Sequence, residues 1–314
     1  MICNNSRIFI SGHTGMLGSA LLRTFHERQY LELITAPRQE LDLTDTAAVK
    51  KFLVTQQPEV ILMGAGRVGG IMENTVRPSD LILQNLAIQN SLFAAAIEIE
   101  SVEAIIYFGS SCMYPSNAPQ PMSEDLILSS LPELTSLPYA VAKLAGVITC
   151  AAINHQYGRP KCLALIPAGG YGPNDNFDPE TAHVIGAMIA KFHKAKIAGR
   201  KSVTLLGTGT PRRDFIFSED IADAVETLLC QNRLCSGPMN IGSGQDISIY
   251  DLAGLISAVV GYSGKLIWDH SSPDGAQLKM LDSSRIQTIG WSAQTSLVDG
   301  VQKTYAWYLR QFLQ

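Results

Sequence analysis

Short apolar runs alternate with longer amphipathic segments along the first half of the chain. The runs have the length and composition of buried strands, and they occupy residues 7–11, 32–35, 60–63, 104–108 and 162–166. Apolar residues at helical spacing lie between these runs, at residues 16–27, 47–56, 86–99 and 139–157. Strands that alternate with helices of this length predict a parallel sheet covered by helices on both faces.

The pattern loosens after Pro167. Residues 169–176 have the glycine- and asparagine-rich composition of a loop. Helical periodicity returns at residues 182–196, 218–229 and from 248 onward, and Ser218 is the expected N-cap of the middle helix. We therefore expect an α/β fold in which residues 1–167, with segments that return later, form a Rossmann-type, doubly wound parallel sheet. Residues 168–314 are expected to form mainly a smaller C-terminal α/β lobe.

The composition is that of a globular enzyme. Hydrophobic residues make up 46% of the chain and charged residues 17%, which indicates a large buried core. A net charge of −4 and a pI near 5.9 argue against a nucleic-acid partner. The first residues lack the basic and apolar regions of a signal peptide, and no uninterrupted apolar run approaches the ~20 residues that span a bilayer. We expect a cytoplasmic protein with no membrane partner.

The six cysteines form no C-x-x-C pair; they lie at positions 3, 112, 150, 162, 230 and 235. This spacing predicts neither a zinc site nor a disulfide framework, and we expect no metal. Five of the thiols are expected to be reduced and structural. Cys112 differs, because it lies two residues after Ser110 in a segment with candidate chemistry.

The segment Tyr139-Ala-Val-Ala-Lys143 opens the helix predicted at residues 139–157. A step of four residues places the Lys ammonium beside the Tyr phenol on one helix face. Because a nearby cation favours phenolate, we expect the pKa of Tyr139 to fall from its usual value of about 10 toward neutrality. Tyr139 would then exchange a proton with a carbonyl or an alcohol, while Ser110 holds the same oxygen.

Three glycines, Gly12, Gly15 and Gly18, lie between the first strand and the first helix. Glycines there let the backbone approach a pyrophosphate at a helix N-terminus, and a tight turn without a ligand is the alternative. The second strand is followed by Arg38 with no acid for a ribose hydroxyl, which favours NADP, although Arg38 could also be a solvated surface residue. Asp42 could bind the adenine amine or cap a loop.

Several motifs resemble the extended short-chain dehydrogenase/reductases and, most specifically, the GDP-L-fucose synthase family among them. The glycine loop, the upstream Ser and Tyr-x-x-x-Lys belong to the wider group. The more specific segments occur in order along nearly the whole chain: GHTGMLGS at 12–19, RVGGI at 67–71, FGSSCMYP at 108–115, YGPNDNF at 171–177, RDF at 213–215 and NIGSG at 240–244.

The resemblance implies a role for each matching residue. Ser110, Tyr139 and Lys143 match the reductase triad, and Cys112 and His183 match the base and acid of an epimerase. Cofactor contacts are expected at Gly12, Thr14, Gly15, Met16, Leu17, Gly18, Arg38, Asp42, Phe108, Lys143, Pro167, Gly170 and His183. Nucleotide-sugar contacts are expected at Lys191, Leu206, Arg213 and Lys279. Members of the family are typically cytosolic homodimers that use NADPH, and their substrate is a GDP-linked 4-keto-6-deoxy sugar.

Most of these side chains also have a purely structural interpretation. Cys112 could pack in the core at a strand end, and His183 could lie on a helix face. Their combination near a catalytic-type Ser favours catalysis instead. Lys191 and Lys279 could be solvated charges, whereas the position of Arg213 in a loop favours anion binding.

A keto group at C4 explains why one site would hold both sets of residues. It acidifies the protons on C3 and C5, so a thiolate can remove each proton and a group on the opposite ring face can return one. Hydride from NADPH then reduces C4 while Tyr139 protonates the alkoxide.

The alternatives are an epimerase/reductase or 4-reductase of another GDP-4-keto sugar, such as a 6-deoxy-heptose or colitose precursor, and a dinucleotide-sensing binding protein. The last should have a broken Tyr-x-x-x-Lys pair, which is intact here.

Three positions depart from the pattern of the family. Thr14 stands where an Arg is frequent, which removes one contact to a 2′-phosphate. Gly169 replaces an Asn that can reach cofactor or substrate, and Leu206 replaces a Trp beside the nucleotide. The loss of these two side chains predicts a roomier pocket and therefore a larger or differently deoxygenated sugar.

Overall fold

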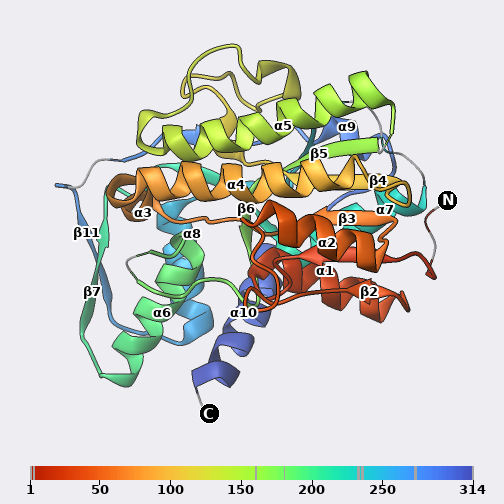
Figure 1. Ribbon diagram of the computed structural model, residues 1–314. Helices are drawn as coiled ribbons and strands as arrows, with labels where there is room; N and C mark the ends of the chain where they lie inside the picture. Colours follow the sequence, from red (N-terminus) through yellow and green to blue (C-terminus); the bar gives the residue numbers. More distant parts are fainter. Residues whose placement is uncertain are drawn as a thin grey trace.

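The computed structural model describes residues 2–312 except 3, 160, 180, 232–233, 235–236 and 272–273. Cys3 and Cys235, which were counted among the thiols, lie outside the described residues. Figure 1 shows a layered α/β part that contains the N-terminus and a smaller lobe that contains the C-terminal helix.

A parallel sheet forms the centre of the first part, which confirms the predicted doubly wound fold. Its strand order is β2-β1-β3-β4-β5-β9. The strands are β1 (Ile8–Ser11), β2 (Leu33–Ile34), β3 (Val60–Met63), β4 (Ala104–Phe108), β5 (Lys161–Pro167) and β9 (Met239–Ile241). All side chains of β1, β3 and β4 are buried, as expected for strands covered on both faces. The strand β9 returns from the second half of the chain to pair with β5.

Two groups of helices cover this sheet. In one group, α2 (Thr46–Gln56), α4 (Pro78–Ala96) and α5 (Leu137–Tyr157) pack in succession, while α1 (Met16–Glu27) packs on α7 (Ser218–Cys230). Right-handed connections that run in opposite directions along a sheet place their helices on opposite faces, so the groups lie on either side. The helix α4 begins at Pro78, earlier than the predicted residue 86, with its Pro in the first turn.

The second lobe has its own apolar core between three helices and short strands. The helices are α6 (Val184–Ile197), α8 (Ile249–Val260) and α10 (Leu297–Phe312). The strands form a sheet β10-β8-β12 with β6 paired to β8, and a separate pair β11-β7. These strands are β6 (Gly169–Tyr171), β7 (Ser202–Leu206), β8 (Arg212–Phe217), β10 (Asp246–Ser248), β11 (Lys265–Asp269) and β12 (Leu278–Lys279).

Two local predictions in the second half of the chain were wrong. Residues 169–171 form the strand β6 rather than a loop, because their main chain pairs with Phe215–Phe217 of β8, and such pairing needs no side chain. The N-cap of α7 is Phe217 and not Ser218, whose hydroxyl donates to Glu219 at 2.8 Å instead. The N-cap of α8 is Ser248, whose hydroxyl accepts from the Asp251 N–H at 3.0 Å.

The helix α5 is more apolar than expected. By length and composition alone, the helical stretch Leu134–Tyr157 could cross a membrane, although Lys143 and other polar residues interrupt its apolar sequence. In the structure it is a core helix that packs against β5 and α4, and 44% of its most apolar window is buried. Its buried positions include Tyr139 and Lys143, so these two side chains lie among the apolar residues of the helix.

Candidate active site

The carboxyl end of β4 and the first turns of α5 bring the predicted redox residues together. Lys143 is buried, and its Nζ donates to the main-chain oxygen of Phe108 at 2.9 Å. The same Nζ lies 5.9 Å from the ring centroid of Tyr139 and 5.3 Å from that of Tyr107. Phe108 is thus placed at the site through its carbonyl group rather than its ring, which is itself buried.

The phenol of Tyr139 has a raised pKa, and the expected lowering was wrong. Burial is the largest cause, the charge of Cys112 adds to it, and only a hydrogen bond to Ser110 acts in the other direction. The four-residue spacing of Tyr139 and Lys143 does not show how deeply the phenol is buried, so the prediction left out the effect of burial on its pKa. The consequence is a neutral phenol at working pH, which is the form that can donate a proton to an alkoxide.

The ammonium of Lys143 is destabilised by its surroundings. Burial lowers its pKa from 10.5 to about 8. A group with this pKa is still mainly charged at neutral pH, and the pKa lies in the range that is common for catalytic groups.

Ser110 links the redox residues to Cys112. It is the N-cap of the short 3-10 helix η1 (Ser111–Met113), where its hydroxyl accepts from the Cys112 N–H at 3.2 Å. Cys112 is half-buried and has a free thiol. Its charge affects the pKa of both Tyr139 and Arg213, so the thiol lies between the redox pair and a basic residue of β8.

His183 lies on the other lobe, as the N-cap of α6. Its side chain is accessible to solvent and makes no capping hydrogen bond, while desolvation by the surrounding protein lowers its pKa below 6.5. The N-terminus of a helix acts in the same direction, because its dipole disfavours a cation. Among the described residues no hydrogen bond joins His183 to Cys112.

The glycine loop fits a dinucleotide. Gly12 has a φ of +71°, and a Cβ there would lie 2.7 Å from the main chain of Ala65. A Cβ on Gly18 would lie 2.1 Å from the carbonyl oxygen of Gly12. Gly15 caps α1 without a side-chain hydrogen bond, so the first amides of the helix are available to an anion. These constraints explain glycine at positions 12 and 18, whereas Gly15 has room for a Cβ.

The remaining predicted cofactor contacts surround this loop to different degrees. Thr14 is exposed, and Met16 and Leu17 begin α1. A Cβ on Gly170 would lie 3.1 Å from Cε of Met16, which places the segment after Pro167 beside the start of α1. These two of the segments predicted to contact the cofactor are therefore neighbours in the structure.

Arg38 and Asp42 lie together on the surface after β2. Asp42 Oδ1 accepts from the amide of Thr44 at 2.9 Å and from its hydroxyl at 2.8 Å, and these hydrogen bonds lower its pKa, as does the charge of Arg38. Asp42 thus caps the loop, as one of the two interpretations predicted. The cap of α2 is Asp45.

Two of the predicted nucleotide-sugar residues are neighbours in the β8–β12 pair. Arg213 and Lys279 are in register, and Lys279 Nζ donates to Glu133 Oε2 at 2.8 Å. Burial lowers the pKa of Arg213. Burial also acts to raise the pKa of Glu133, but the hydrogen bond and the charge of Lys279 outweigh it, so the pKa of Glu133 is below its usual value. Glu133 precedes α5 in the chain, and no feature of its sequence context singled it out.

Lys191 and Leu206 lie on the other side of the second lobe. Lys191, on α6, donates to the main-chain oxygen of Thr204 in β7, and burial lowers its pKa. Leu206 ends β7 and is 65% exposed. This exposure alone does not test the predicted roomier pocket, which stays a prediction.

The space beside Gly169 does not fit the prediction of a roomier pocket. A Cβ there would lie 2.9 Å from the ring of Phe215 and 3.0 Å from the main-chain oxygen of Asp214. The pairing of β6 with β8 therefore fills the space that an Asn side chain would need. The prediction of a larger sugar then depends on Leu206 alone.

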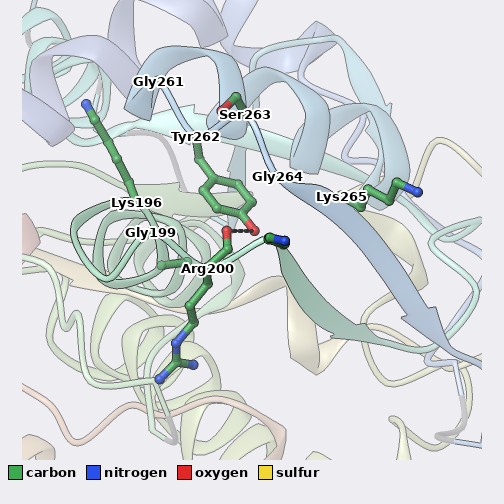
Figure 2. Close-up of a pocket in the computed structure, with 10 residues that line it drawn as sticks. Lys196, Gly199, Arg200, Gly261, Tyr262, Ser263, Gly264 and Lys265 are labelled. Atoms are coloured by element: carbon green, nitrogen blue, oxygen red, sulfur yellow. Dashed lines mark hydrogen bonds between the residues drawn. The ribbon is translucent and has the colours of Figure 1, made fainter.

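A hollow of about 440 Å³ lies away from all these residues (Figure 2). The end of α6, the loops that lead from α6 to β7 and from α8 to β11, and the first residue of β11 line it. Lys196 Nζ donates to the carbonyl oxygen of Val260, the last residue of α8, at 2.8 Å. Cations stabilise helix C-termini, which accounts for this lysine without a ligand.

Comparison with known proteins gives consistent matches. The NAD dependent epimerase/dehydratase family model matches residues 8–242. GDP-L-fucose synthase 1 of Arabidopsis thaliana is 42% identical over 98% of this chain and 94% of its own length. A GDP-6-OMe-4-keto-L-xylo-heptose reductase from C. jejuni superposes with a TM-score of 0.93 at 32% identity, covering 99% of both chains. The NADP-bound GDP-mannoheptose C4 reductase from Campylobacter jejuni has a TM-score of 0.89 at 33% identity, covering 98% of this chain and 100% of its own.

Proposed function

This chain belongs to the NAD dependent epimerase/dehydratase family, and from that premise we propose that it is an NADPH-dependent 3,5-epimerase and 4-reductase of a GDP-4-keto-6-deoxy sugar. The observation that carries the proposal is the placement of Cys112 beside the Ser110–Tyr139 pair. A reductase needs only the Ser, Tyr and Lys side chains. A thiol in the same site adds a base that can act on carbons next to the carbonyl group.

The residues of the chain fit the reduction of a carbonyl group. NADPH, when bound, supplies the hydride. Ser110 and Tyr139 would both hydrogen-bond the C4 oxygen, and the neutral phenol of Tyr139 donates its proton to that oxygen as it becomes an alkoxide. Lys143 fixes the end of β4 through the carbonyl group of Phe108 and keeps a positive charge near the phenol.

The same oxygen contacts serve the epimerisation that precedes reduction. When Ser110 and Tyr139 polarise the C4 carbonyl, the anion formed at C3 or C5 spreads onto the oxygen as an enolate. Cys112, as thiolate, takes the proton from one ring face, and His183 returns a proton to the opposite face. The proton lost by carbon goes to sulfur, and the proton gained comes from the imidazolium form of His183, so the centre inverts without net redox change. The thiol and the neutral imidazole then exchange protons with solvent.

The basic pair Arg213 and Lys279 suits the diphosphate of the nucleotide. The Arg213 guanidinium donates to the main-chain oxygens of Arg212 and Ala276, at 2.8 Å and 2.6 Å, which fixes its plane. Guanidinium groups bind phosphates with paired hydrogen bonds. Lys191 and Leu206, farther along the second lobe, would contact the nucleoside.

A second candidate is a 4-reductase of a GDP-4-keto heptose that performs no epimerisation. Two solved heptose reductases share the fold over nearly the whole chain. The open surface at Leu206 also favours a larger sugar. Retention of both Cys112 and His183 favours the epimerase/reductase as the first choice.

The state and location of the protein are also part of the proposal. We propose a cytoplasmic homodimer without a nucleic-acid or membrane partner. Free thiols at Cys112, Cys150 and Cys230 suit a reducing compartment. Exposed apolar side chains on α4 and α5, Leu83, Val141 and Ile148, suit a protein–protein contact.

Two measurements on one reaction mixture test the function. NADPH oxidation on addition of GDP-4-keto-6-deoxy-mannose reports reduction, and uptake of solvent deuterium at C3 and C5 reports epimerisation. We expect Cys112→Ser to keep NADPH binding and to lose most of the exchange. Cys230→Ser, at an exposed thiol, is the matched control and should leave both unchanged. Normal exchange in Cys112→Ser would refute the assignment, and much faster turnover of a 4-keto heptose would favour the second candidate.

A further inference from the structure

One loop of the first part touches both halves of the proposed site. Residues 64–70 lead from β3 to the short helix α3 (Ile71–Val76). A Cβ on Gly66 would lie 2.8 Å from Asn85 Oδ1 and 3.6 Å from Lys143 Nζ, so the loop main chain borders the redox residues. At its other end, the Gly70 N–H donates to the main-chain oxygen of Thr181 at 3.0 Å. Thr181 lies two residues before His183.

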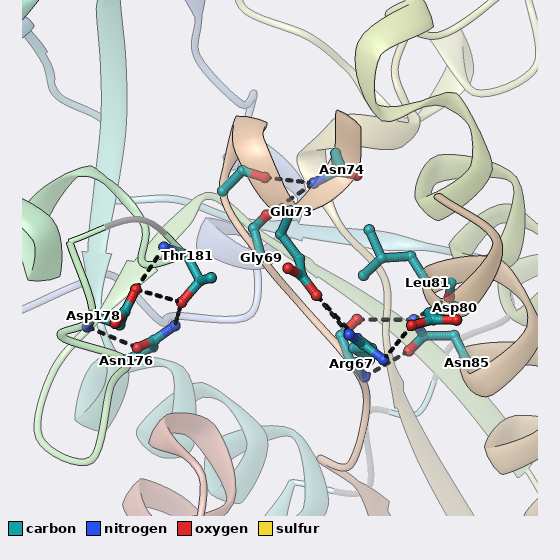
Figure 3. Close-up of polar contacts among 11 residues, drawn as sticks. Arg67, Gly69, Glu73, Asn74, Asp80, Leu81, Asn85, Asn176, Asp178 and Thr181 are labelled. Atoms are coloured by element: carbon teal, nitrogen blue, oxygen red, sulfur yellow. Dashed lines mark hydrogen bonds and ion pairs between the residues drawn. The ribbon is translucent and has the colours of Figure 1, made fainter. Parts of the chain in front are cut away.

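The middle of this loop is held by a polar brace centred on Arg67 (Figure 3). Asn85 is buried; its Oδ1 accepts from the Arg67 N–H at 3.1 Å, and its Nδ2 donates to the Arg67 oxygen at 2.8 Å. The Arg67 side chain donates through Nε and Nη2 to Glu73 Oε1, at 3.2 Å and 2.7 Å, and through Nη1 to Asp80 at 3.0 Å. One guanidinium therefore ties the loop to both α3 and α4.

The ion pair with Glu73 is more than a surface contact. The Arg67 and Glu73 side chains are only 22% and 12% exposed. Partly buried, charge-assisted hydrogen bonds to a guanidinium are stronger and more directional than exposed ion pairs. The conformation of the loop thus depends on Arg67.

The segment that receives the loop is organised in the same way. Asp178 Oδ1 accepts from the Thr181 N–H at 3.0 Å and from its hydroxyl at 3.1 Å. Asn176 Nδ2 donates to the Thr181 hydroxyl at 2.9 Å (Figure 3). A Cβ on Gly70 would lie 2.8 Å from the Ala182 oxygen, so the two segments are in close main-chain contact.

The orientation of His183 depends on this contact. Among the described residues its imidazole has no hydrogen-bond partner, and its side chain does not cap α6. Its direction is therefore set by the main chain of residues 181–183. That main chain is fixed on one side by Asp178 and on the other by Gly70.

We propose that Arg67 and Glu73 are positioning residues for the epimerisation. They hold the 64–70 loop, and through the Gly70–Thr181 hydrogen bond the loop sets His183 against the ring face opposite Cys112. This inference rests on the proposed function, because it needs His183 to act as a proton donor. Neither Arg67 nor Glu73 touches the reacting atoms.

The test compares exchange with reduction in variants of this brace. Arg67→Ala should lower solvent-deuterium uptake on the order of tenfold to a hundredfold, the effect of a small misplacement of a catalytic group. Reduction of a 4-keto sugar that needs no epimerisation should change less than about threefold, and NADPH affinity should stay the same. Arg67→Lys should recover part of the exchange. Glu73→Gln keeps the shape of the pair and should lose an intermediate amount.

Two controls separate positioning from general damage. Arg77→Ala removes an exposed Arg at the junction of α3 and α4, and it should leave the exchange unchanged. Adding Arg67→Ala to His183→Asn should cause no further loss of exchange, because the two act through one group. Additive losses, equal losses of exchange and reduction, or full exchange in Arg67→Ala would each overturn the inference. If the unaltered enzyme shows no exchange, the proposed epimerisation fails, and the inference falls with it.

Discussion

At the scale of single residues, burial sets the charge states on which the chemistry depends. Lys143 has a pKa of about 8, so its cation is lost in mildly alkaline solution. We expect kcat/KM for reduction to fall above pH 8 as the charge near Tyr139 disappears. A pH profile of NADPH oxidation measures this. A profile that stays flat to pH 10 would show that the charge is not required.

The same burial predicts an effect on stability. Because the folded-state pKa of Lys143 lies below the 10.5 of the unfolded chain, the unfolded state binds more protons between about pH 8 and 10.5. The unfavourable burial of the charge is fully present below pH 8 and is relieved as pH rises. Lys143→Met should therefore stabilise the enzyme by about 1–3 kcal/mol at pH 7, less the lost hydrogen bond to Phe108, and the gain should shrink toward pH 10.5. Denaturant unfolding at both pH values measures the difference.

Residue chemistry was predictable from the sequence where it follows from local spacing. Tyr139, Lys143, Ser110 and Cys112 are brought together as the motif implied. The direction of the pKa of Tyr139 was not predictable, because burial depends on the helices that pack around α5. The contacts of Arg67 could not be predicted from its motif, because Glu73, Asp80 and Asn85 reach it only through the fold of the loop and of α3 and α4.

At the scale of elements, the βα unit that begins the fold has no room for a side chain at Gly12 or Gly18. Gly12→Ala would bring a Cβ to 2.7 Å from Ala65 at a φ of +71°, and Gly18→Ala would bring one to 2.1 Å from the Gly12 oxygen. We expect each to destabilise the protein by about 1–3 kcal/mol and to abolish NADPH binding. Thermal unfolding and a fluorescence titration with NADPH measure both effects.

A glycine elsewhere provides the control. Gly254 lies inside α8 with no atom within 4 Å of an added Cβ, so Gly254→Ala should stabilise the helix by about 0.5–1 kcal/mol and leave NADPH binding unchanged. Loss of NADPH binding in Gly254→Ala would show that the effect of replacing a glycine does not depend on its position in the cofactor loop. Unchanged binding in Gly12→Ala would contradict the assignment of the loop.

The elements of the sheet were predictable because buried parallel strands are continuous apolar runs. The strands of the second lobe were not, since β6 contains two glycines and β12 only two residues. These strands exist through pairing with β8, a partner distant in sequence. The same pairing places Phe215 beside Gly169 and removes the space that the sequence had suggested.

At the scale of the whole molecule, the two lobes are joined on both sides of the site. The strand β9 and the helix α7 return to the first part after the chain has entered the second. The 64–70 loop reaches the second lobe at Thr181. The proposed catalytic residues thus come from both lobes, with Cys112 on the first and His183 on the second. This arrangement follows from chain crossings that local patterns do not specify.

The exposed face of α4 and α5 determines the last prediction, the state of assembly. Val141 and Ile148 are spaced by two helical turns on α5 and are 42% and 49% exposed, and Leu83 on the adjacent α4 is 65% exposed. A second copy of the chain would bury this face, so we expect sedimentation at twice the chain mass of 34.0 kDa. Ile148→Glu should give monomers, because a charge would be buried in an apolar contact. Ile197→Glu, at an equally apolar but separate site on α6 that is 73% exposed, should remain dimeric. A monomeric unaltered protein, or a dimer that survives Ile148→Glu, would contradict this interface.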